Sequence, residues 1–359
     1  MAERRIDAET LSRWVVGLFE AAGSDSQEAR LAAEHLVGAN LAGHDSHGVG
    51  MIPRYVLSLK AGALRLNQRI EIRRDSGALV AIDGRQGLGQ SVAWQAMNLA
   101  IERTREHGIC AIALTRAHHI GRIGHWAEQA LAAGFASIHF VNVVSKVYVA
   151  PFGGVEPRFA TNPFTVGLPR RNAPPLLLDF ATSAIAFGKT RVAFNKGVPV
   201  AEGSLIDADG KPTTDPSVMH VPPFGALLPM GLHKGYALAM ICELLGSALA
   251  GGPTAHDDSI PVGPEIWNGM FAIVFDPARL GDPDEFEAEA QRYEKWIKSA
   301  RLAPGVDRIR MPGEPELDAR AQRLADGIAI DTETLSQLDS AARAIGNDVP
   351  LLSPLTRAA

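Results

Sequence analysis

The segment Leu79-Val80-Ala81-Ile82-Asp83-Gly84-Arg85-Gln86-Gly87-Leu88-Gly89 decides between two kinds of fold. Its apolar first half predicts a strand over residues 79–83. The following residues predict a helix over 91–107 and a second buried strand over 109–114. A strand, a glycine-rich turn and a helix in this order are typical of a Rossmann dinucleotide-binding unit.

The spacing of these glycines argues against that unit. It runs in the reverse order from the dinucleotide fingerprint, and Thr115 and Arg116 stand where an acidic residue would bind the ribose. We therefore reject a Rossmann fold and interpret the glycines as a tight turn.

The N-terminal third is predicted to be helical. Asp25 and Glu28 form a plausible capping box for a helix over 28–41. Pro53 can occupy the first turn of a helix over 54–60. An apolar stripe at helical spacing precedes both, at Leu11, Trp14, Val15, Leu18 and Phe19.

The rest of the chain mixes strands and helices. Glycine, proline and polar residues dominate 195–229, which predicts a long loop that could act as a lid. The helix over 235–250 is apolar nearly all round and is predicted to be central. The other predicted helices cover 121–133, 284–299, 317–326 and 332–344, and the other predicted strands cover 136–144, 164–168, 176–179 and 271–275.

Composition excludes several classes of protein. The chain has 359 residues, of which 46% are hydrophobic, enough for one large or two intertwined domains. A net charge of -5 argues against nucleic acid as a partner. Cys110 and Cys242 lie in apolar runs, which predicts buried thiols in a reducing compartment. Neither a signal peptide nor a membrane span is predicted, so we expect a cytoplasmic protein.

Two histidine-centred segments suggest proton-transfer chemistry. They are His44-Asp45-Ser46-His47-Gly48-Val49 and Ala117-His118-His119-Ile120-Gly121. Imidazole changes its charge near neutral pH, so these segments favour an enzyme acting on a small oxygenated substrate. A zinc site built from His44, His47, His118, His119 and His125 is the alternative, but the spacing matches no zinc motif and we predict no metal. A structural role is the simpler interpretation of His44 and of His118 taken alone.

Other segments could hold an anion. A helix over 184–189 could offer its N-terminus to a pyrophosphate, whereas capping by Thr182 or Ser183 is the alternative. His233 and Lys234 begin a helix, where a phosphate or Glu243 could balance their charge.

Two turns are ambiguous. Glu314, after Pro312-Gly313, could accept hydrogen bonds from ribose hydroxyls, although by itself the segment is a simple turn. Asn268-Gly269 is most often a hairpin signal.

Taken together, these motifs resemble the second, non-Rossmann family of malate and L-lactate dehydrogenases, in particular its hydroxycarboxylate dehydrogenase B branch. The resemblance follows the chain in order through His44–Tyr55, His119-Ile120-Gly121, Ala160-Thr161-Asn162-Pro163, Leu178–Ser183, Gly188-Lys189, His233–Tyr236 and Pro312-Gly313-Glu314.

The resemblance implies a mixed α+β fold. A cofactor-binding domain with a mostly antiparallel sheet, at about 76–299, would pack on a helical domain formed from 1–75 and about 300–359. It also implies a homodimer that interconverts 2-oxo acids and 2-hydroxy acids with NAD or NADP.

The resemblance also assigns roles to residues. His119 would donate and accept the proton, and His47, the second catalytic residue, would orient the substrate with Ser46 and Tyr55 nearby. Substrate would contact Ser46, His47, Arg54, Tyr55 and Thr161. The cofactor would lie along Gly121, Arg122, Ile123, Leu178, Asp179, Phe180, Ala181, Thr182, Lys189, His233, Lys234, Asn268, Pro312, Gly313 and Glu314.

One position departs from the family pattern. Many members carry an arginine four residues after the loop histidine, where this chain has Met51. Arg54, Arg122 or Lys146 could then hold the substrate carboxylate, and Met51 suggests an aromatic or branched 2-oxo acid. The alternatives are a reductase of cyclic imine 2-carboxylates and a non-catalytic ligand-binding protein.

Overall fold

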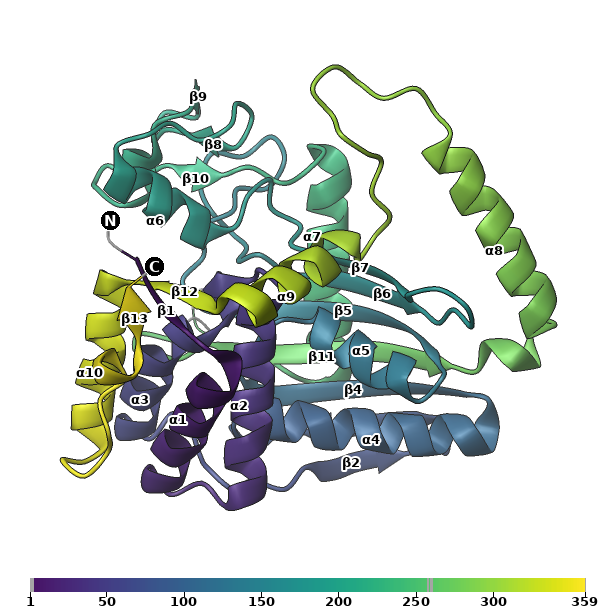
Figure 1. Cartoon of the computed structure of the whole chain (residues 1–359), viewed down its shortest axis with the longest axis horizontal. Coiled ribbons are helices and arrows are strands. Elements are labelled where there is room, and N and C mark those ends of the chain that lie inside the picture. Colours follow the sequence, from purple (N-terminus) through teal and green to yellow (C-terminus); the bar gives the residue numbers. More distant parts are fainter. Residues whose placement is uncertain (1–2, 257, 259–260, 359) are drawn as a thin grey trace.

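A seven-stranded sheet organises the middle of the chain, as a computed structural model shows for residues 3–256, 258 and 261–358 (Figure 1). Among the described residues, neighbouring strands of this sheet are antiparallel, except that β3 and β4 are parallel. This confirms a mostly antiparallel, non-Rossmann sheet. In spatial order its strands are β2 (Glu71–Asp75), β3 (Leu79–Asp83), β4 (Ile109–His118), β11 (Trp267–Phe275), β5 (Ala136–Val144), β6 (Phe164–Leu168) and β7 (Leu176–Phe180).

Helices cover both faces of this sheet. On β5, Val141 packs into the apolar cluster of α4 (Gly89–His107) and α5 (Gly124–Ala132), whereas its neighbour Asn142 faces α7 (His233–Gly246). The prediction that α7 is central is wrong for the single chain. Its outer face exposes Met240, Ile241 and Leu244, because only one side of the helix contacts the sheet.

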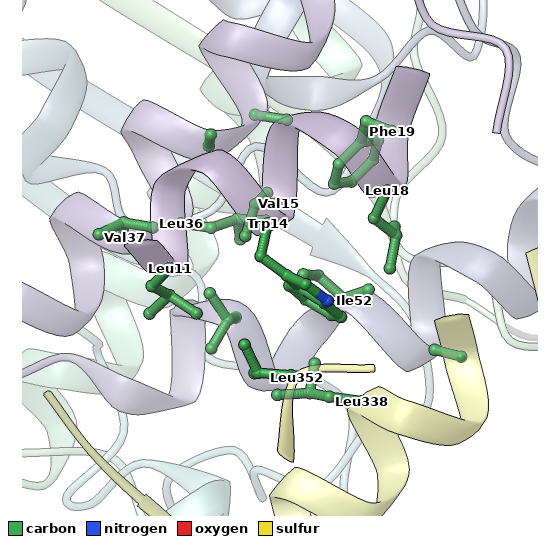
Figure 2. Close-up of a cluster of buried hydrophobic side chains, with 14 of the residues drawn as sticks. Leu11, Trp14, Val15, Leu18, Phe19, Leu36, Val37, Ile52, Leu338 and Leu352 are labelled. Atoms are coloured by element: carbon green, nitrogen blue, oxygen red, sulfur yellow. The ribbon is translucent and has the colours of Figure 1, made fainter. Parts of the chain in front are cut away.

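The helical unit draws on both ends of the chain, as expected. Figure 2 shows its core, in which Trp14, Leu36 and Ile52 pack with Leu338 and Leu352. Its boundaries near residues 75 and 300 stay a prediction. Its helices are α1 (Ala8–Ala21), α2 (Ser26–Leu41), α3 (Ile52–Lys60), α9 (Glu314–Asp326) and α10 (Thr332–Ile345), beside a small sheet of β12 (Ile328–Asp331), β1 (Glu3–Ile6) and β13 (Arg357–Ala358).

Helix α8 (Pro283–Lys298) lies at the edge of the molecule (Figure 1). It is held by the buried guanidinium of Arg170, which follows β6 and donates to Glu287 at 2.9 Å. That hydrogen bond lowers the pKa of the Glu287 carboxyl to about 2. No helix among the described residues is long and apolar enough to cross a membrane.

The predicted loop over 195–229 is wrong in part, because short strands form within it. They are β8 (Leu205–Ile206), β9 (Pro212–Thr213) and β10 (Ala226–Leu227), which make a second small sheet beside α6 (Phe187–Lys196). These strands have two residues each, too few for an alternating pattern to be visible in the sequence.

Several predicted boundaries also change. The Asp25 side chain caps α2, but Glu28 bonds to Ser24 and Asn67 instead of completing the capping box. Asn268 lies inside β11 and not in a hairpin turn. Helix α5 begins at Gly124 rather than at residue 121, because Gly121 has a φ of 74°.

Gly121 and Gly134 flank α5 and form a matched pair for a stability test. Both have positive φ, but a Cβ on Gly121 would lie 1.9 Å from the His35 ring. A Cβ on Gly134 would have no described atom within 4 Å, its adjacent residues aside. We expect Gly134→Ala to cost about 1 kcal/mol of unfolding free energy and Gly121→Ala about 3 kcal/mol or more, in urea denaturation. Equal losses would contradict the packing of His35 against this loop.

Candidate active site

The site is built on a loop, His119 to Ile123, that joins β4 to α5. Three contacts fix its main chain. The Ile120 amide donates to Asn268 Oδ1 at 2.9 Å, and the Trp126 indole donates to the Ile120 carbonyl at 3.1 Å. A Cβ on Gly89 would lie 2.1 Å from the His119 carbonyl oxygen, so α4 begins directly against the loop. The backbone that carries His119 therefore has little freedom to move.

His119 is buried and hydrogen-bonded to a tyrosine. The residue is 7% exposed, and its Nδ1 lies 2.7 Å from the hydroxyl of Tyr55 on α3. Burial first, and then the nearby His47, His118 and Arg54, hold the pKa of His119 well below its ordinary value. The imidazole is therefore neutral at pH 7 in the free chain.

His47 lies beside His119 although it belongs to a different unit of the fold. The two rings stack with centroids 5.7 Å apart, and Ser46 Oγ lies 3.0 Å from His47 Nδ1. Burial lowers the pKa of His47 to about 4, because Asp179 offsets only part of the cost of charging the ring. Both predicted catalytic histidines thus face one site.

Side chains from both ends of the chain hold the His47 loop. Asn40 on α2 accepts from the Val49 amide at 2.9 Å and donates to Asp45 at 2.7 Å. Arg323 on α9 donates to both carboxylate oxygens of Asp45, at 2.6 and 2.9 Å. Sequence reasoning missed Asn40 and Arg323, because nothing in their local sequence links them to this loop.

Arg122 provides unpaired donors at the site. Its side chain is 3% exposed and donates through Nη2 to Glu128 at 2.5 Å. Nε and Nη1 have no hydrogen-bond partner among the described residues, although Nη1 lies 3.9 Å from Asp179. Asp179 in turn accepts from the Gly124 amide and from Thr165. A buried, partly unpaired guanidinium is suited to an anion.

An apolar patch lies next to these polar groups. Met51 packs against Val143, Ala160 and Ile266. Arg54 does not extend freely into this region, since it donates to the main-chain carbonyl of Pro264 at 2.6 Å and to that of Glu265 at 3.3 Å.

The other predicted site residues occupy several places. Thr182 and Ser183 do not cap α6, as they bond to the Thr161 and Ile185 carbonyls, so that alternative is wrong. Leu178, Asp179 and Phe180 end β7, followed by Ala181, and the Pro312 carbonyl accepts from the amide of Leu177 in the same strand. Lys189, His233 and Lys234 are exposed on α6 and α7. Gly313 precedes Glu314, which pairs with Lys298 at 2.6 Å.

Two results bear on the remaining interpretations. His44 lies 3.1 Å from Glu316 on α9, as a structural role predicts. Within the described part of the chain, no three His, Cys, Asp or Glu side chains are grouped as metal ligands. Sequence reasoning also missed Gln90, which follows the glycine-rich turn and donates to Tyr55 at 3.0 Å.

Comparison with known proteins assigns the chain to a family. The sequence profile of the malate/L-lactate dehydrogenase family matches residues 6–339. The chain belongs to this family. It is 51% identical to hydroxycarboxylate dehydrogenase B from Escherichia coli, over 95% of this chain and 94% of that one.

Solved structures of the family share the fold. One, described as a putative malate/lactate dehydrogenase from Escherichia coli, has a TM-score of 0.92 and 49% identity over 95% of each chain. A second, the Δ1-piperideine-2-carboxylate reductase of Pseudomonas syringae, has a TM-score of 0.81 and 30% identity over 94% of this chain and 99% of that one. This member of the malate/L-lactate dehydrogenase family is therefore an oxidoreductase of 2-hydroxy and 2-oxo acids.

His118 should make the stability of this dehydrogenase pH-dependent. Neither ring nitrogen has a partner among the described residues, and burial lowers its pKa from 6.5 to about 3. Below pH 6.5 the unfolded chain binds a proton that the folded chain does not, so stability falls as the pH falls. When the pH is lowered from 6.5 to 5, the free energy of unfolding should fall in both proteins. We expect it to fall by about 1.5 kcal/mol less in His118→Phe than in the wild type, as measured by urea denaturation. Parallel losses would contradict a buried neutral His118.

Proposed function

We propose that His119 is the proton donor and acceptor in a nicotinamide-dependent interconversion of a 2-oxo acid and a 2-hydroxy acid. The observation that carries this proposal is the buried imidazole of His119, bonded to Tyr55 at 2.7 Å and stacked on His47. Reduction of a ketone places negative charge on its oxygen, and a positioned imidazole supplies the proton that neutralises it.

The low pKa of His119 in the free chain fits this role. Its largest cause is burial, and no carboxylate is among the causes. A substrate carboxylate would bring negative charge close to the ring, which raises its pKa and favours the protonated form. His119 then gains its proton when substrate is present.

Exposed basic side chains in the first turns of two helices suit the phosphates of a dinucleotide. Lys189 lies near the start of α6, and His233 and Lys234 begin α7. When bound, the nicotinamide would supply the hydride. We propose that Gly121, Ile123, Leu178–Thr182, Asn268 and Pro312–Glu314 complete this site, Asn268 through its hold on the loop. The residues do not favour NAD over NADP.

Arg122 is the best candidate for the substrate carboxylate. Arg54 donates two hydrogen bonds to main-chain carbonyls, whereas two donors of Arg122 have no partner in the described part of the chain. Ser46, Tyr55 and Thr161 would complete the substrate site. Because Met51 packs in an apolar cluster, we propose an aromatic or branched 2-oxo acid as substrate.

A homodimer is the proposed assembly. The outer face of α7 exposes Met240, Ile241 and Leu244, which form an apolar patch of the kind that a partner subunit covers. The cytoplasmic location stays a prediction.

A second candidate activity is the reduction of a cyclic imine 2-carboxylate. It is favoured by the likeness to the Δ1-piperideine-2-carboxylate reductase. The same imidazole would then protonate nitrogen instead of oxygen. Rates with 2-oxo acids and with cyclic imine carboxylates, followed by NADH and NADPH absorbance, separate the two activities.

Replacement of His119 tests the proposed proton transfer. We expect His119→Asn to lower kcat about a hundredfold or more, because the reacting oxygen loses its proton donor. Binding of NADH or NADPH, followed by fluorescence, should remain. His139→Asn is the control, since this histidine is also buried but bonds to Ser137 on β5. Full activity of His119→Asn would remove the proposal.

Charge on α7 tests the dimer. Leu244 is 48% exposed and Leu324, on α9, is 61% exposed. We expect Leu244→Glu to produce monomers in analytical ultracentrifugation, because a carboxylate would be buried between subunits, and Leu324→Glu to stay dimeric. A dimeric Leu244→Glu or a monomeric wild type would contradict this interface.

A further inference from the structure

A third buried side chain, that of Gln90, is linked to His119 through Tyr55. Gln90, on the first turn of α4, is 1% exposed. Its Nε2 lies 3.0 Å from the Tyr55 hydroxyl, which lies 2.7 Å from His119 Nδ1. Gln90, Tyr55 and His119 therefore form one hydrogen-bonded chain that joins α4, α3 and the loop after β4.

The direction of the hydrogen bonds in this chain follows from Gln90. Its Nε2 also faces the His119 main-chain carbonyl, at 3.5 Å, so an amide oxygen in the same place would face another carbonyl oxygen. With Nε2 donating to Tyr55, the single hydroxyl proton of Tyr55 is free to point to His119 Nδ1. A ring nitrogen that accepts carries no proton, so the proton of the neutral ring is on Nε2.

Protonated His119 requires the opposite direction. Both ring nitrogens then carry protons, so Nδ1 donates to Tyr55 and the hydroxyl proton of Tyr55 needs a different acceptor. Gln90 Oε1 is buried and has no partner among the described residues. Rotation of the amide by half a turn would present this oxygen to Tyr55. The rotated amide loses the long 3.5 Å contact of Nε2 with the His119 carbonyl, so this arrangement is favoured only when the Tyr55 hydroxyl proton needs an acceptor.

Among the described residues, the other charged and titratable groups around His119 have no hydrogen bond to the Tyr55 hydroxyl. They are His47 from its loop, His118 from β4, Arg54 from α3 and His35 from α2. Each of these groups interacts with His119 in the direction that lowers a histidine pKa, so each disfavours a protonated ring nearby. Gln90, in contrast, is hydrogen-bonded to Tyr55 and has both a donor and an acceptor on one rotatable amide.

We propose that Gln90 is a positioning residue that sets, through Tyr55, which nitrogens of His119 carry a proton. Its amide donates to Tyr55 when His119 is neutral and accepts from Tyr55 when His119 is charged. The consequence for turnover rests on the proposed role of His119, whereas the position of the proton does not.

The test uses the full-length protein labelled with ¹⁵N-histidine. NMR chemical shifts distinguish a protonated from an unprotonated ring nitrogen, and the His119 signals are assigned by their loss in His119→Asn. Gln90→Glu has only acceptor oxygens while its carboxylate is ionised, and Gln90→Met has neither donor nor acceptor. Gln95→Glu is the matched control, because Gln95 lies on the same helix but donates to the Gln68 carbonyl.

We expect the wild type at neutral pH to carry the His119 proton on Nε2. Gln90→Glu should move it to Nδ1 and raise the apparent pKa in the pH profile of kcat/KM by about one unit, because Tyr55 then accepts from the ring. Gln90→Met should lower kcat about tenfold with little change in KM, the effect of one lost hydrogen bond. Gln95→Glu should resemble the wild type.

Two results would overturn the proposal. One is a wild-type His119 protonated on Nδ1, and the other is a Gln90→Glu variant that matches Gln90→Met in both measurements. If Gln90→Glu does not fold, the Tyr55→Phe variant is compared with the Tyr55→Phe, Gln90→Met double variant. Both should have the same pH profile of kcat/KM, and an additional change in the double variant would overturn the proposal. Full activity of His119→Asn would instead remove the proposed function and leave the NMR result intact.

Discussion

The arrangement of this protein depends on the close contact between the start of α4 and the main chain of the His118–His119 segment. Gly89 allows this contact, because any side chain there would collide with the His119 carbonyl. The Gly87 carbonyl accepts from the His118 amide at 3.0 Å on the same side. On the other side Asn268 binds the Ile120 amide. The imidazole is therefore held in place by backbone contacts before any ligand arrives.

The same contact explains the electrostatics of the site. A segment packed this tightly excludes water, so charging His118 or His119 is costly and the pKa values of both are low. A second histidine, His47, reaches the site from a loop tied to α2 and α9. The helical unit, made from both ends of the chain, thus places the imidazole of His47 beside that of His119, which directly follows a strand of the sheet.

Local patterns in the sequence were sufficient for much of this. The reversed glycine spacing at 84–89 excluded a Rossmann unit, and the antiparallel sheet agrees. The pairing of the His47 and His119 loops followed from motif order and family resemblance. Gln90 was not found, because a single glutamine after a glycine-rich turn has no local signature. The exposure of α7 was also missed, since an apolar helix can be covered by its own chain or by a partner.

The sequence by itself determined the elements whose causes are local: the amphipathic helices of the N-terminal unit, the cap at Asp25, the long strands and the identity of the chemical groups. Only the tertiary structure decided which of those groups meet. Tyr55 and His119 are 64 residues apart, and Arg323 is 278 residues from the Asp45 that it binds. Contacts at such separation depend on how the sheet and helices pack together. Protonation and hydrogen-bond direction depend in turn on that packing, because burial sets the cost of each charge and each unpaired polar atom.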